Sequence, residues 1–132
     1  MPKRARKLAV DRARPYIDSP LMTQRVRLGP QISARIDGSY GVYRTQKHTG
    51  PRGSGTCNCP SERWPCKHLR ALEATWRANP TSFFDVQRVL DSLARHSKAE
   101  LVRAIGDMAL RAPEALAVFG VADFIDRDDS EA

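Results

Sequence analysis

Long apolar runs are absent from this sequence of 132 residues, because arginine or aspartate soon interrupts each apolar stretch. A membrane-spanning helix needs about 20 consecutive apolar residues, so we expect no transmembrane segment and no membrane partner. The basic N-terminus is not followed by an apolar stretch, and it does not resemble a secretory signal. These absences predict an intracellular, cytoplasmic protein, associated with the nucleoid if the source is bacterial.

Motifs typical of enzymes are also missing. The sequence has no glycine-rich phosphate loop, no Ser/His/Asp pattern and no His-Glu-x-x-His helix. The carboxylates are concentrated towards the C-terminus, where solvated charge is the ordinary interpretation. We therefore expect a non-catalytic protein without a small-molecule substrate.

Cysteine is scarce, and all three cysteines lie in one short segment. Cys57, Cys59, Cys66 and His68 form a Cys-x-Cys pair, a gap of six residues and a Cys-x-His pair. Four soft or borderline ligands are what a closed tetrahedral zinc site requires, and a closed site has no open position for a catalytic water. The sequence therefore predicts a structural Zn²⁺ as the cofactor, held by these four residues.

Four other interpretations of the cluster fit it less well. A disulfide would leave one thiol over and would not involve His68, and a reducing compartment disfavours it. A Cys/His nucleophile needs one cysteine and an orienting third group. An iron–sulfur cluster uses similar ligands at different spacings. The last alternative is a chance gathering of residues that merely pack.

Apolar periodicity predicts an α+β fold, in which a small antiparallel sheet with a zinc-anchored ββα finger precedes a short α-helical region. Alternating patterns over residues 23–29, 32–38 and 40–46 predict three antiparallel strands. A loose glycine-rich loop at residues 48–56 is expected to lead to Cys57. After the cysteines the period changes, which predicts a helix over residues 66–79 that ends before Pro80.

Further helices are predicted over residues 81–96, 97–112 and 113–120. Phe83 lies on the apolar stripe of the first, Ser97 and Glu100 have capping-box spacing in the second, and Pro113 suits the first turn of the third. The expected organisation is a basic flexible arm at 1–14, strands plus zinc finger at 15–79, a helical region at 80–125 and an acidic tail at 126–132.

Charge is unevenly distributed along the chain. Residues 1–79 hold 16 of the 22 lysines and arginines but only 5 of the 15 acidic residues. A basic half favours a polyanion such as nucleic acid, and the ordinary alternative is solvated surface charge. The residues expected to contact nucleic acid are Lys3, Arg4, Arg6, Lys7, Arg44, Lys47, Arg52, Arg63, Lys67 and Arg70. Tyr43 and Trp64 are candidates for stacking on unpaired bases. The ordinary alternatives are that Tyr43 pairs across strands and that Trp64 shields the zinc.

The apolar stripes of the C-terminal half exceed what one small finger can cover. The ordinary interpretation is that the three helices pack on one another. The alternative is that the helices of residues 83–119 present a groove to a protein partner. This alternative predicts a protein-interaction subunit or adaptor of a larger complex in place of a nucleic-acid-binding module.

The cysteine and histidine pattern, taken with its flanks, resembles the SWIM zinc finger. The resemblance rests on Cys57-x-Cys59-x6-Cys66-x-His68, on Pro60, on PCKHLRAL running into a helix and on the strand-like GSYGVYRTQ. It covers roughly residues 36–78, with a longer glycine-rich gap than compact members have. It implies a ββα unit with these four residues as zinc ligands. It also implies a role in DNA binding, favoured over RNA, or in protein–protein contact, and some bacterial members have a similar helical stretch after the finger.

Overall fold

The computed structural model describes residues 12–50, 53–60 and 65–120. Its elements form two compact units, with the boundary between Val89 and Leu90. The elements are η1 (Arg14–Tyr16), β1 (Met22–Leu28), β2 (Gln31–Asp37), β3 (Val42–His48), β4 (Gly55–Cys57), α2 (Lys67–Ala78), η2 (Pro80–Ser82), β5 (Phe84–Asp85), α3 (Gln87–Leu93), α4 (Lys98–Arg111) and η3 (Pro113–Phe119). The predicted α+β class is confirmed.

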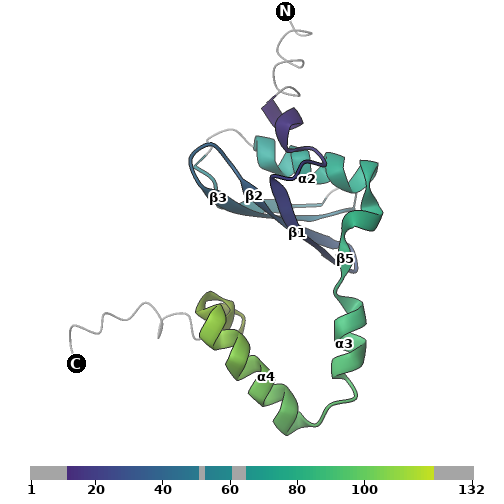
Figure 1. Cartoon of the computed structure of the whole chain (residues 1–132), viewed down its shortest axis with the longest axis vertical. Coiled ribbons are helices and arrows are strands. Elements are labelled where there is room, and N and C mark those ends of the chain that lie inside the picture. The colour runs from purple at the N-terminus through teal and green to yellow at the C-terminus, as the bar shows by residue number, and fades with distance from the viewer. Residues whose placement is uncertain (1–11, 51–52, 61–64, 121–132) are drawn as a thin grey trace, which may run out of the picture. The chain divides into compact units, whose positions relative to one another are not determined.

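The first unit is built on a five-stranded sheet in the order β4-β3-β2-β1-β5 (Figure 1). Strands β1 to β4 pair antiparallel with their neighbours, and β5 pairs parallel with β1. The three predicted antiparallel strands are confirmed. The short strands β4 and β5 were not predicted, because strands of two or three residues carry almost no periodicity.

The hydrophobic core lies between this sheet and α2, which packs with η1 on one face of the sheet (Figure 1). Ile32, Ala34 and Ile36 of β2 are almost completely buried, as is Leu72 of α2. Burying each large aliphatic side chain stabilises the fold by about 1.5–3 kcal/mol. Because side chains alternate along a strand, the residues between these core positions point to the opposite face of the sheet.

The predicted helix over residues 81–96 is wrong in its first third. Pro80–Ser82 form η2, Phe84 and Asp85 pair with β1, and α3 begins only at Gln87. Phe83, expected on a helical stripe, is buried in the core of the first unit, with its ring centroid 5.2 Å from that of Trp76. Tertiary packing here outweighs the local helical pattern.

The second unit contains α4 and η3. The N-cap half of the predicted capping box is confirmed, since Ser97 Oγ accepts a 3.2 Å hydrogen bond from the Glu100 amide. The Glu100 carboxylate accepts a 3.1 Å hydrogen bond from the Ser97 hydroxyl instead of from the Ser97 amide. Pro113 begins η3, as expected for a first-turn proline. None of the residues of α4 or η3 is buried, and the same holds for α3.

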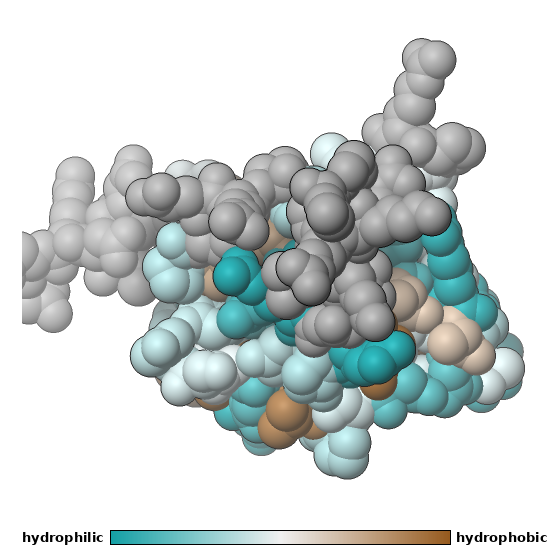
Figure 2. Space-filling model, turned by 90° about the horizontal axis from the view of Figure 1, so that it is seen from above, coloured by the Kyte–Doolittle hydropathy of each residue, from teal (hydrophilic) through white to brown (hydrophobic). Residues whose placement is uncertain are grey.

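Seen from above the view of Figure 1, the described surface is mostly hydrophilic and is broken by small hydrophobic patches (Figure 2). Within the described ranges, no helix is long and apolar enough to span a bilayer. The acidic tail and residues 1–11 of the basic arm lie outside the described residues. The last part of the arm belongs to the fold, because Ala13 is 3% exposed in the core.

Candidate metal centre

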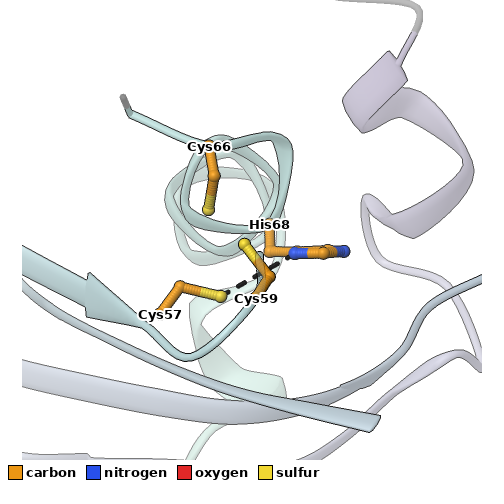
Figure 3. Close-up of side chains that lie close together, drawn as sticks. All are labelled: Cys57, Cys59, Cys66 and His68. Atoms are coloured by element: carbon orange, nitrogen blue, oxygen red, sulfur yellow. Dashed lines mark hydrogen bonds between the residues drawn. The ribbon is translucent and has the colours of Figure 1, made fainter. Parts of the chain in front are cut away.

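The end of one strand and the start of one helix bring four ligand side chains together. Cys57 is the last residue of β4, and Cys59 follows two positions later. Cys66 is the N-cap of α2, with extended backbone angles of φ −71° and ψ 166°, and His68 lies in the first turn of that helix. Figure 3 shows the four side chains gathered around one point. Their ligand atoms all lie within 4.8 Å of one another.

These distances fit a tetrahedral zinc ion. Bond lengths of about 2.3 Å to sulfur and about 2.0 Å to nitrogen place the ligand atoms of such a site about 3.5–3.8 Å apart. Cys57 Sγ and His68 Nδ1 are already 3.7 Å apart (Figure 3). Cys66 and His68 are nearly completely buried, while Cys57 and Cys59 are half-buried. The four residues therefore form a Cys₃His site able to hold one zinc ion.

Two of the four ligand side chains have shifted pKa values. Burial raises the pKa of the Cys57 thiol to about 12, with smaller effects from Cys59 and Cys66. A bound divalent ion reverses this preference, since it stabilises the thiolate. Burial, followed by the charge of Lys67, lowers the pKa of His68. This shift keeps the imidazole neutral, which is the form that binds metals.

Two tyrosine rings enclose the His68 imidazole. The ring centroid of Tyr43 lies 5.0 Å from it, and that of Tyr16 lies 5.2 Å away in an edge-to-face arrangement. His68 Nδ1 faces the thiols, while the buried Nε2 has no hydrogen-bond partner among the described residues. The rings thus fix the plane of the imidazole and exclude water from one side of the site. The sequence had suggested that Tyr43 pairs across strands; it lies opposite Ile36 in the sheet and also packs on the zinc ligand.

Local contacts position the segment that carries the cysteines. Asn58 Oδ1 accepts a 2.8 Å hydrogen bond from the Arg44 amide, which ties the turn between Cys57 and Cys59 to β3. Gly55 lets β4 approach α2 closely, because a Cβ there would lie 2.8 Å from Leu69 Cδ2. A side chain at this position would require the Leu69 side chain to move.

The basic residues expected to contact nucleic acid fall into three groups. Lys47 and Arg70 line one groove of about 280 Å³ between β3, the residues around Gly55 and α2. Arg44 lies on the opposite face of the sheet, and the Lys67 ammonium lies 5.9 Å from the Tyr16 ring centroid. The remaining expected residues lie outside the described ranges: Lys3, Arg4, Arg6, Lys7, Arg52 and Arg63, as does the aromatic Trp64.

Sequence reasoning did not select three residues that the fold places beside these groups. Tyr16 comes from a segment far from the cysteines, and only packing shows that it covers His68. Arg35 lies directly opposite Arg44. That pairing was within reach of the sequence, since the turn at residues 37–41 fixes the register of the two strands. Gln24, which contacts Arg44, carries no sequence signal.

The fold and the site together define a class of protein, a zinc finger in which the end of a strand and the start of a helix hold one ion. Within that class, the chain carries a SWIM zinc finger, since residues 53–76 match that family. The matched segment contains all four ligands and most of α2. No curated protein and no solved structure matches the chain.

Proposed function

We propose that this chain is a non-catalytic zinc-binding module that binds nucleic acid, with DNA favoured over RNA. The observation that carries this proposal is the groove beside the metal-anchored helix. Lys47 from β3 and Arg70 from α2 are distant in sequence, and both line it. Both residues are among those that the sequence predicts to contact nucleic acid.

The electrostatics of this groove favour an anion. Arg70 Nε is buried and has no hydrogen-bond partner among the described residues. Lys47 Nζ donates a 3.2 Å hydrogen bond to the Gly53 carbonyl, which holds it at the groove without neutralising its charge. Glu73, the acidic residue of the lining, forms a 2.6 Å ion pair with Arg77. A phosphate would therefore meet two cations whose charges are largely uncompensated.

Salt-dependent binding tests this proposal. Zinc-loaded protein is titrated into a labelled DNA duplex, its single strand and the matching RNAs at several NaCl concentrations, and the affinity is followed by fluorescence anisotropy. Each phosphate contact contributes a slope of about −0.9 in log K against log salt for duplex DNA. The double variant Lys47→Gln/Arg70→Gln should reduce the slope by about 1.8. The matched variant Arg95→Gln/Arg103→Gln in the second unit should leave it unchanged, and equal effects of the two variants would contradict the proposal.

A role as a protein-interaction subunit is the second candidate, and the second unit favours it. None of its described residues is buried, while Leu110 is 85% exposed and Phe119 is 61% exposed. Ile105, Met108, Leu116 and Phe119 line an apolar groove of about 230 Å³. Such exposed apolar surface is typical of a binding site. This role predicts co-purification of one partner that Met108→Ser/Leu110→Ser releases, with no retention of nucleic acid at moderate salt.

A further inference from the structure

The face of the sheet turned away from α2 is a second surface with unusual chemistry. Since Ile32, Ala34 and Ile36 of β2 point into the core, Arg35 points to the other face. Strand register places Arg44 of β3 on the same face, opposite Arg35. The same face also includes Val26 and Leu28 of β1 and Phe84 of β5, through the pairing of Val26 with Ser33 and Phe84. We call this surface the open sheet face.

Arg35 and Arg44 lie opposite each other on this face, and Asp37 of the same face is near Arg35. Like charges directly opposite each other destabilise a pair of strands. Arg35 forms a long ion pair with Asp37, in which the Arg35 Nε and the Asp37 Oδ1 are 3.6 Å apart. The Arg44 guanidinium donates a 2.6 Å hydrogen bond to the amide oxygen of Gln24, which fixes its position and leaves its charge intact. The open sheet face therefore presents a positioned cation with a neutral partner.

Gln24 reaches Arg44 from a strained backbone. Its φ angle is 50°, in the left-handed region that residues other than glycine rarely adopt. It lies at an irregularity in the pairing of β1 with β2, between Thr23 and Val26. Bulges of this kind re-aim side chains near functional sites, and backbone strain is concentrated at such sites. The strained residue is thus the one that contacts the Arg44 guanidinium.

An exposed aromatic side chain lies on the same face, at its β5 edge. Phe84 is 52% exposed. Arg44 and Phe84 are three strands and two residues of register apart, or about 16 Å at ordinary strand dimensions. A flexible strand of a few nucleotides can bridge this distance.

We propose that the open sheet face binds single-stranded nucleic acid, with Arg35 and Arg44 contacting phosphates and Phe84 stacking on a base. The charge of the face selects a polyanion, and its exposed aromatic ring selects unpaired bases. A duplex would use the arginines but would leave Phe84 without a base to stack on. This inference rests on the proposed function, and it adds the strandedness of the ligand and a contact surface separate from the groove of Lys47 and Arg70.

The test compares an oligothymidylate, an oligouridylate and a DNA duplex on the zinc-loaded full-length protein, by anisotropy over a range of NaCl concentrations. We expect both single strands to bind more tightly than the duplex. Arg35→Gln/Arg44→Gln should reduce the salt slope for a single strand by about 1.4, since each phosphate contributes about 0.7. Phe84→Ala should weaken single-strand binding by about 5- to 150-fold and barely affect the duplex.

Two matched variants control for general effects. Arg95→Gln/Arg103→Gln removes the same charge from the second unit, and Tyr40→Ala removes an aromatic side chain that is 93% exposed in the turn between β2 and β3. Both should bind like the wild type. Zinc content and the circular dichroism spectrum of each variant establish that the fold is retained.

Crosslinking of the unaltered protein gives a readout that needs no variant. A strand containing 5-bromouracil, irradiated in the complex, should crosslink to the peptide containing Phe84 or to the β2 peptide around Arg35, neither of which lines the groove of Lys47 and Arg70. Crosslinks confined to the groove of Lys47 and Arg70 would overturn the open-face proposal. If Lys47→Gln/Arg70→Gln weakens binding while the open-face variants do not, the face is wrong and the proposed function stands. If the wild type binds no nucleic acid, both are wrong.

Discussion

The Arg44 amide donates a 2.8 Å hydrogen bond to Asn58 Oδ1, and Asn58 lies between two zinc ligands, Cys57 and Cys59. The side chain of the same arginine contacts Gln24 on the open sheet face. One residue of β3 thus links the turn of the metal centre to the proposed nucleic-acid surface. Loading of the metal and positioning of the Arg44 guanidinium should therefore be coupled.

Replacing Asn58 tests this link. Asn58→Ala removes the acceptor of the Arg44 amide, and a lost hydrogen bond of this kind costs about 1 kcal/mol of unfolding free energy. Zinc should also bind more weakly, because the turn that holds Cys57 and Cys59 is less restrained. Asn58→Asp keeps an acceptor oxygen and is the matched control. Urea denaturation and competition with a zinc-binding dye measure both effects, and equal behaviour of the two variants would show that the bond is not needed.

Removal of one zinc ligand should abolish metal binding. His68→Ala deletes a buried ligand, so the purified protein should lose its one zinc ion per chain and the first unit should unfold at room temperature. A structural zinc ion contributes about 10–16 kcal/mol of apparent binding free energy in small zinc-finger peptides, far more than one side chain usually provides. His96→Ala, at an exposed histidine near Ser97, is the matched control. Elemental analysis and circular dichroism provide the measurements, and a stable metal-free His68→Ala variant would contradict a structural role.

The metal site was predictable because all its ligands lie within twelve residues, where spacing alone determines which side chains can meet. Strands β1 to β3 were predictable for a similar reason, since each has a clear alternation and adjacent strands in sequence are adjacent in the sheet. The N-cap of α4 is equally local. In each case the signal and the structure depend on the same short stretch of chain.

Features that depend on distant contacts were missed. β5 pairs with β1 across more than fifty residues, and its two residues belong to a segment with helical periodicity. Phe83 also fits the apolar spacing of a helix. It lies outside a helix because its side chain is buried in the core of the first unit, against the ring of Trp76. The strain at Gln24 is also invisible in the sequence, because glutamine has no preference for the left-handed region.

The core between the sheet and α2 should dominate the stability of the first unit. Leu72 is completely buried, so Leu72→Ala should lower the unfolding free energy by about 2–5 kcal/mol through lost burial and a cavity. Leu110→Ala makes the same chemical change at a residue that is 85% exposed, and it should cost less than about 0.5 kcal/mol. Thermal unfolding of the zinc-loaded variants, followed by far-ultraviolet circular dichroism, which reports on the helices of both units, distinguishes them. Similar costs would mean that the second unit is covered in solution.

Asp18 should make stability depend on pH on the acid side. Hydrogen bonds from Arg25, at 2.7 Å, and then from Asn79 lower the pKa of Asp18 in the folded state. The unfolded chain therefore binds more protons than the folded one at pH values between the lowered pKa and about 3.9. The contribution of this carboxylate is present above the unfolded pKa, and it is lost as the pH falls through the folded pKa.

Asp18→Asn removes that dependence without disturbing the backbone, since asparagine also tolerates the positive φ of 47° found at Asp18. Urea midpoints of the two proteins, measured from pH 7 to pH 3, should differ at neutral pH and converge in acid. Because zinc release in acid would itself unfold the first unit, the comparison uses only pH values at which elemental analysis finds zinc bound to both proteins. A difference that stays constant over this range would show that the charge of Asp18 contributes nothing and that only its hydrogen-bonding geometry matters.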